Sequence, residues 1–314
     1  MKKLISILTL TIALLLPQTA FGWNATGHEL VASIAWDNLS PTARGRIIDL
    51  LLKAPDGACL KEMFQTTGPN EDERKRQFFI QAATWSDVVR PKNKDDHRPC
   101  TSFHRRDWHF VDHFWKGVSG SATNPPTDLS TPPMAATNAV ERLLNFRPIV
   151  VSNNAPADRA IDLAWILHLV GDIHQPLHTS GRVTATETSG DAGGNFFTLG
   201  PKLNLHSYWD GIVDRAKPRH APNETFPSYI KRLTSTFEVD FPKSHFSNLE
   251  PGQFDAWAKE SFQKAKNNAY PKSLKRGQMP SAAYQSKTFG IAEESIAEGG
   301  YRLANLLETL FGGN

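Results

Sequence analysis

The segment WILHLVGDIHQPLH, residues 165–178, holds the densest set of side chains that could do chemistry. His168 and Asp172 are four residues apart, so on a helix they lie on one face, one turn apart. Pro176 should end that helix, and His178 follows two residues later. Imidazole nitrogens and carboxylate oxygens are ligands that Zn²⁺ accepts. The helix and its exit turn are therefore a candidate metal site.

A second pair with the same spacing follows, His206 and Asp210 in NLHSYWD. A single pair of this kind is more often a surface hydrogen bond than a metal site. Two such pairs and a further histidine together favour metal binding. The HExxH signature is missing from the sequence, which excludes an ordinary zinc protease of that type.

Apolar residues at helical spacing predict a mainly α protein. Residues 91–130 and 180–204 lack that spacing, and the Gly and β-branched residues of 180–204 predict a loop with a small hairpin. No linker-like change in composition divides the chain, so we expect a single compact multi-helix domain. The expected helices cover residues 28–39, 41 to about 53, 71–90, 135–151, 156–174, 206–217, 224–238, 252–268 and 280–311, the last interrupted at Gly299-Gly300.

The overall charge of the chain is nearly balanced. Its 314 residues include 35 Lys and Arg against 32 Asp and Glu, a formal net charge of +3. This excess is too small for binding nucleic acid or membranes by bulk electrostatics. A hydrophobic content of 39% with 10% aromatic residues excludes a disordered protein.

Residues 1–22 have the pattern of a secretory signal peptide. Lys2 and Lys3 precede an apolar run from Leu4 to Leu16, and small residues come just before the expected cleavage point. An uncleaved anchor helix is the alternative, although the run is short for a bilayer. Cleavage would make Trp23 the first residue of the mature protein.

The mature domain, residues 23–314, is expected to be secreted or periplasmic, without stable membrane insertion after cleavage. Cys59 and Cys100 could form one disulfide in an oxidising compartment, or remain free and buried. The sequence does not decide between the two states.

Six motifs occur in a fixed order along the chain, and they resemble those of a known enzyme family. The motifs are WNATGH at 23–28, TWSDVVR at 84–90, WHFVD at 108–112, HLVGDIHQPLH at 168–178, GGN at 193–195 and NLHSYWD at 204–210. The sequence is similar to the zinc-dependent single-strand-specific nucleases, the fungal S-one/P-one type and the plant bifunctional nucleases, within the phospholipase C/nuclease superfamily. The resemblance continues more loosely through WAKESF at 257–262. It implies a fold of the phospholipase C/nuclease type.

The resemblance also implies a cluster of three zinc ions. The ligands of the first ion would be Asp87, His109, His168 and Asp172. Those of the second would be His178, His206 and Asp210. The third ion would take the α-amino nitrogen and main-chain oxygen of Trp23, with His28, and share Asp172.

By the same resemblance, the chain would be a phosphodiesterase that cuts single-stranded DNA and RNA to 5′-phosphorylated products. Apart from the resemblance, we expect a monomer. Mononucleotides would be further substrates if it also has 3′-nucleotidase activity. Asp87 and Arg90 would act in catalysis, with the arginine orienting the aspartate and contacting the phosphate. The base would be held by Phe110, Asp112, Gly193 and Asn195.

Several of these positions could instead have a purely structural role. Arg90 could form an ordinary surface ion pair, Phe110 could belong to the core, and Asn195 could cap a turn. At the level of function, the alternatives are a zinc-dependent phospholipase C and a secreted zinc-binding protein without catalysis. The nuclease-like NLHSYWD motif and the residues that would bind a base favour a nuclease over these two alternatives.

Overall fold

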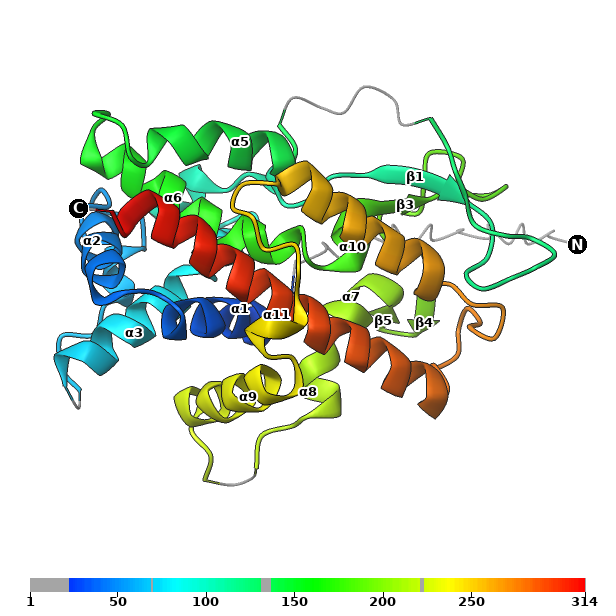
Figure 1. Ribbon diagram of the computed structural model, residues 1–314. Coiled ribbons are helices and arrows are strands. Elements are labelled where there is room, and N and C mark those ends of the chain that lie inside the picture. The colour runs from blue at the N-terminus through cyan, green and yellow to red at the C-terminus, as the bar shows by residue number, and fades with distance from the viewer. Residues whose placement is uncertain (1–22, 69, 131–136, 221–222, 314) are drawn as a thin grey trace, which may run out of the picture.

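The computed structural model describes residues 23–68, 70–130, 137–220 and 223–313, and the expected signal peptide lies outside these ranges. Helices dominate the described chain, which confirms the mainly α prediction (Figure 1). The helices are α1 (Ala25–Asp37), α2 (Pro41–Leu51), α3 (Glu71–Ala82), α4 (Trp85–Val88), α5 (Ala139–Ile149), α6 (Pro156–Asp172), α7 (Leu205–Asp210), α8 (Ile212–Ala216), α9 (Phe226–Asp240), α10 (Phe254–Asn268) and α11 (Ala282–Phe311).

Side-chain caps decide where the first two helices begin. The Asn24 side chain accepts a hydrogen bond from the backbone N–H of Gly27 at 3.2 Å, so α1 starts three residues before the predicted position 28. Ser40 caps α2 in the same way, and Pro41 occupies its first turn as expected. α1, which carries His28, is buried along most of its length by contacts with α3, α6, α9 and α11.

The predicted helix over residues 71–90 is two helices. Asn70 caps α3, but the helix ends at Ala82 and the short α4 starts at Trp85. At the break, the Thr84 hydroxyl donates to the Gln81 carbonyl at 2.8 Å, which competes with continuation of the helix. The Trp85 indole also donates to the Ala58 carbonyl at 2.6 Å. A separate α4 reorients the turn that bears Asp87.

The last helix runs without a break from Ala282 to Phe311, so the predicted interruption at Gly299-Gly300 is wrong. Instead, the glycines allow close packing. A Cβ at Gly300 would lie 2.6 Å from the Cβ of Ile34 on α1, and one at Gly299 would lie 3.1 Å from the ring of His174. α11 therefore crosses the molecule diagonally in direct contact with α1 and with the end of α6 (Figure 1).

A buried arginine joins α11 to the same end of α6. Arg302 is fully buried, and its Nη1 donates to His174 Nε2 at 3.0 Å. His174 Nδ1 in turn donates to the Val170 carbonyl at 2.6 Å. The turn that follows Asp172 is thus held by α11 through side-chain contacts.

Short strands flank the helices. β1 (His113–Lys116) lies between β2 (Thr127–Asp128), antiparallel to it, and β3 (Ser180–Arg182), parallel to it. β4 (Thr198–Gly200) and β5 (Leu203–Asn204) form an antiparallel hairpin, which confirms the hairpin expected near 180–204. Pairing of β1 with β3 brings the chain after His109 beside the chain after His178.

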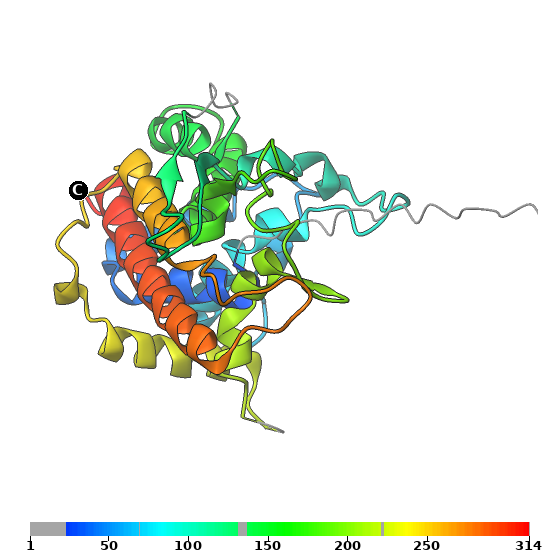
Figure 2. The same cartoon turned by 90° about the vertical axis from the view of Figure 1, so that its right-hand side faces the viewer.

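The described part of the chain has further features that bear on function. Cys59 and Cys100 form a disulfide, which resolves the alternative left open by the sequence. In the described ranges, no helix combines the length and the apolar character needed to cross a membrane. Viewed from the side, α10 and α11 lie together on one flank, and the segment after α4 projects from the opposite flank (Figure 2).

Candidate metal centre and substrate pocket

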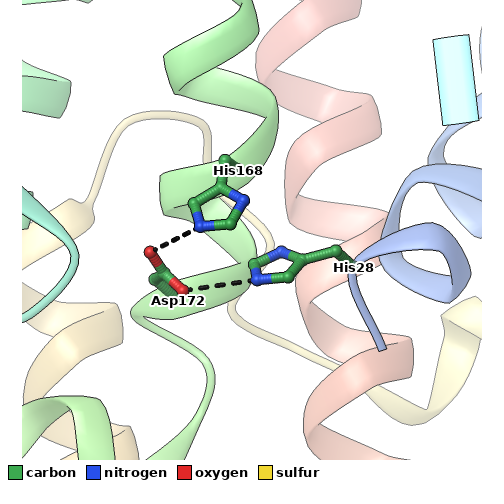
Figure 3. Close-up of side chains that lie close together, drawn as sticks. All are labelled: His28, His168 and Asp172. Carbon is green, nitrogen blue, oxygen red and sulfur yellow. Dashed lines mark ion pairs between the residues drawn. The ribbon is translucent and has the colours of Figure 1, made fainter. Parts of the chain in front are cut away.

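The end of α6 and the start of α1 bring His28, His168 and Asp172 together in the interior (Figure 3). His28 Nε2 lies 3.4 Å from Asp172 Oδ1, and His168 Nε2 lies 3.1 Å from Asp172 Oδ2. The two imidazole rings stack with their centroids 3.8 Å apart. One carboxylate therefore faces two buried imidazoles from different helices.

A second group shares His168 and adds Asp87 from α4 and His109, so that one ligand atom from each lies within 4.8 Å of the others. His109 Nδ1 lies 3.1 Å from Asp172 Oδ2 and 3.0 Å from His168 Nε2. The four residues predicted to hold the first ion are thus neighbours, with Asp172 between this group and His28.

The third group contains His178, His206 and Asp210, the set predicted for the second ion. The Nε2 atoms of the two histidines lie 3.0 Å apart. His178 Nδ1 donates to the His109 carbonyl at 2.6 Å, and His206 Nδ1 donates to the Gly193 carbonyl at 2.8 Å. These bonds fix the ring orientation and leave the Nε2 lone pairs facing each other, as in metal-ligating histidines.

Several buried polar atoms of these groups have no hydrogen-bond partner among the described residues. They are His28 Nδ1 and Nε2, Asp172 Oδ1 and Asp210 Oδ2. Buried polar groups nearly always have a hydrogen-bond partner. The concentration of unpaired nitrogen and oxygen atoms at this place therefore indicates that a further species binds there. Imidazole nitrogens and carboxylate oxygens in groups of three fit a metal ion such as zinc.

Burial and mutual charge shift the protonation of these residues strongly. Burial and the neighbouring His168 lower the pKa of His28 to about 4. The pKa of Asp172 is held well below its usual range because His168 and His178 outweigh the effect of burial. Burial, reinforced by the charge of Asp172, raises the pKa of Asp210 well above its usual range. A cation bound beside Asp210 would remove this penalty on its charged form.

The remaining predicted residues of the metal centre lie beside these groups. Trp23 is fully buried, and the backbone N–H of the next residue, Asn24, donates to the Asp210 carbonyl at 3.1 Å. Burial lowers the pKa of Arg90, while the charge of Asp87 raises it, which places the arginine within electrostatic reach of that carboxylate. Sequence reasoning did not single out Gln175, although it lies in the HQPLH motif. Its Nε2 donates to Asp210 Oδ1 at 2.7 Å.

A pocket of about 160 Å³, partly open to solvent, adjoins the three His/Asp groups. Its lining includes all four residues predicted to hold a base, together with His109, His178 and His206. Sequence reasoning missed the other lining residues. They are Arg106, Leu177, Ala192 and Phe196.

The loop around Gly193 forms one wall of the pocket. Gly193 has a φ of +61°, and a Cβ there would lie 2.3 Å from the Leu177 carbonyl, so only glycine fits. Asn195 Nδ2 donates to the Ala192 carbonyl at 2.7 Å. Half of the Phe196 side chain is exposed. The adjacency of Phe196 to the GGN motif is the one sequence signal that could have marked it.

Asp112, which also lines the pocket, has a perturbed carboxyl group. Burial, with a smaller contribution from the charge of Asp191, raises the pKa of Asp112 to about 6. Asp191 is itself buried and accepts a hydrogen bond from the Tyr270 hydroxyl at 2.6 Å. Near pH 6 the Asp112 carboxyl can therefore either donate or accept a hydrogen bond.

Comparison with known proteins agrees with this geometry. A family model described as S1/P1 Nuclease matches residues 23–312. Endonuclease 2 of Arabidopsis thaliana is 25% identical over 298 residues, covering 93% of this chain and 91% of the relative. Nuclease S1 of Aspergillus oryzae is 23% identical, covering 99% of this chain and 98% of the relative. Nuclease P1 of Penicillium citrinum is 22% identical, covering 92% and 98%.

These matches confirm the resemblance drawn from the ordered motifs, and the family model extends it across residues 23–312. The chain therefore belongs to the S1/P1 nuclease family, a family of metallonucleases, and it is a hydrolase that acts on nucleic acids.

Proposed function

We propose that the chain is a secreted endonuclease with three zinc ions that hydrolyses single-stranded DNA and RNA to 5′-phosphorylated products. The observation that carries the proposal is the junction of three His/Asp groups with a pocket lined by an aromatic ring, a carboxyl and an amide. Removal of the 3′ phosphate from mononucleotides would use the same site.

The residues that would hold the zinc ions are those predicted from the resemblance. Asp87, His109, His168 and Asp172 would hold one, His178, His206 and Asp210 another, and Trp23, His28 and Asp172 the third. The ions would supply Lewis-acid activation of water and neutralise charge that builds up on the phosphoryl oxygens. Asp172, with one oxygen toward His28 and the other toward His168, has the position of a ligand shared between two ions.

Arg90 would bind a phosphoryl oxygen and orient Asp87. Its backbone N–H donates to the Asp87 carbonyl at 3.2 Å, which places the arginine one turn after the aspartate. A guanidinium stays charged at neutral pH and can contact two oxygens at once. This position supports a role in stabilising charge as phosphorus is attacked.

Phe110 would stack on the base, while Asp112, the Asn195 amide and the backbone at Gly193 would bind its edge. Stacking stabilises by about 1–3 kcal/mol per base and tolerates any sequence, but it requires an unpaired base. The aromatic and polar lining of the pocket therefore supports cleavage of single strands in preference to duplexes.

A nuclease assay with metal analysis tests the proposal. We expect the purified mature protein to contain three zinc ions per chain and to cut single-stranded DNA and RNA faster than duplex DNA. A chelator should abolish the activity, and added zinc should restore it. Hydrolysis of phosphatidylcholine without cleavage of nucleic acid would contradict the proposal, as would nuclease activity that persists after complete zinc removal.

The expected signal peptide supports the proposed location outside the cytoplasm, and the disulfide is consistent with an oxidising compartment. Fractionation of cells that express the full chain tests this part. The mature protein should begin at Trp23 when its N-terminus is sequenced. Retention of the full chain in the cytoplasm would contradict it.

A further inference from the structure

Positive charge is concentrated in one short part of the chain, residues 90–106, here called the cationic segment. It contains six Lys and Arg residues and two acidic residues, a local excess of four. The whole chain has a net charge of only +3, so all the other residues together are slightly negative. The cationic residues are Arg90, Lys92, Lys94, Arg98, Arg105 and Arg106.

Both ends of the cationic segment lie at the candidate site. It begins at Arg90, three residues after Asp87. It ends at Arg106, which lines the substrate pocket together with Phe110. Burial lowers the pKa of Arg90, and the positive charge of Arg106 lowers it further. The two ends of the segment are therefore close in space as well.

Internal contacts hold the segment in a defined shape. Arg98 donates to the backbone carbonyls of Val88 and Arg90, each at 3.0 Å, and it forms an ion pair with Asp96. The disulfide from Cys59 to Cys100 fastens the middle of the segment to the body of the protein. The segment is therefore a fixed loop, and it projects from the flank opposite α11 (Figure 2).

Four of the six cationic side chains of the segment face solvent. Lys92, Lys94, Arg105 and Arg106 are all exposed. The Arg105 guanidinium lies 5.6 Å from the centre of the Trp108 ring and donates to the Ser102 carbonyl at 2.7 Å. A stacked and hydrogen-bonded arginine presents its charge at a fixed position, which suits repeated contact with an anion.

We propose that the cationic segment binds the phosphates of nucleotides next to the one held in the pocket. The inference rests on the proposed function. A single strand that leaves the pocket carries one negative charge per nucleotide, and contacts to its phosphates position the strand without reading its sequence. Strands of many nucleotides should therefore bind more tightly than dinucleotides, and the difference should weaken with salt.

The test compares binding of single strands at several salt concentrations. The probe is a labelled phosphorothioate strand of about twenty nucleotides, which keeps the phosphate charge and resists hydrolysis. Fluorescence anisotropy gives Kd for the zinc-loaded mature protein and for the triple variant Lys92→Ala, Lys94→Ala, Arg105→Ala. The matched control, Lys53→Ala, Lys231→Ala, Lys243→Ala, removes three exposed lysines away from the pocket.

For single strands, each phosphate contact contributes about 0.7 to the slope of log Kd against log salt. Loss of three contacts should lower that slope by about 2, so that between about 50 and 200 mM salt wild-type binding weakens roughly 20-fold more than binding of the variant. The control should keep the wild-type slope. The double variant Lys92→Ala, Lys94→Ala, which leaves the contacts of Arg105 intact, should lower it by about 1.4.

Two results would overturn the inference. One is an unchanged slope in both the triple and the double variant. The other is an equal fall in the control, which would indicate a general charge effect. Failure of the proposed function is recognised separately, because it would appear as wild-type protein that binds the strand but does not cleave an ordinary one.

Discussion

Gly171 lies on α6 between His168 and Asp172, and replacing it by alanine gives a sharp test of the metal centre. The added Cβ would lie 2.7 Å from His28 Nδ1 and 3.1 Å from its Cε1. Contacts under 3.0 Å are not sustained, so the imidazole of His28 must move. It cannot move freely because it is buried and stacked on His168 at 3.8 Å.

The magnitude follows from two opposing effects. Overpacking of a buried site costs about 1–3 kcal/mol. Alanine in place of glycine within a helix stabilises by about 1 kcal/mol. The net loss in free energy of unfolding should therefore be at most about 2 kcal/mol, small enough for Gly171→Ala to fold.

The effect on the site should be much larger than the effect on stability. Displacement of His28 should remove one zinc ion per chain and lower the rate of strand cleavage by about a hundredfold. Urea denaturation, zinc analysis of the dialysed protein and steady-state kinetics measure the three quantities.

The matched control is Gly290→Ala on α11, where an added Cβ meets nothing within 4 Å. This variant should gain about 0.5–1 kcal/mol and keep its zinc and its activity. A Gly171→Ala protein with the zinc content and rate of the wild type would refute the assignment of His28 as a ligand.

Three further predictions concern other parts of the chain. One extra residue before Trp23, verified by mass spectrometry, should lower both zinc content and turnover, and undiminished turnover would refute the role of the terminal amine. Replacing Cys59 and Cys100 by alanine opens a link that spans 41 residues, so the free energy of unfolding in urea should fall by about 4 kcal/mol; a loss under about 1 kcal/mol would contradict the chain-entropy reasoning. Burial raises the pKa of folded Asp112 to about 6, whereas the ordinary pKa of an aspartate is 3.8, so the contribution of Asp112 to stability should fall as pH rises between these values. The free energy of unfolding of Asp112→Asn minus that of the wild type should increase as pH rises from 3.8 to about 6 and then level off. A difference that does not change with pH would show that the pKa of Asp112 is not raised.

Local sequence patterns were sufficient for the groups that share one element. His168 and Asp172 fall on one face of α6 because of their spacing alone, and the exit turn at Pro176 brings His178 after them. The ordered motifs identified the family. They also named the four pocket residues, which the structure places around one cavity.

Features that depend on tertiary contact were not predictable in this way. Gly299 and Gly300 look like helix breakers, but the missing side chains make room for Ile34 and His174, and the packing offsets the low helix propensity of glycine. The end of α3 depends on Thr84, whose hydroxyl bonds back to the preceding turn. Phe196 followed a recognised motif, yet its place in the pocket depends on the path of the loop.

The contacts of α11 also have a consequence for the order of events during synthesis. Every proposed zinc ligand precedes residue 211, whereas α11, which packs on α1 through Gly300 and holds the exit of α6 through Arg302, is the last helix of the chain. All the proposed ligands are therefore translated before the helix that packs against two of the elements that carry them. The packing around the centre is therefore complete only when the last helix is in place, in whichever compartment the chain folds.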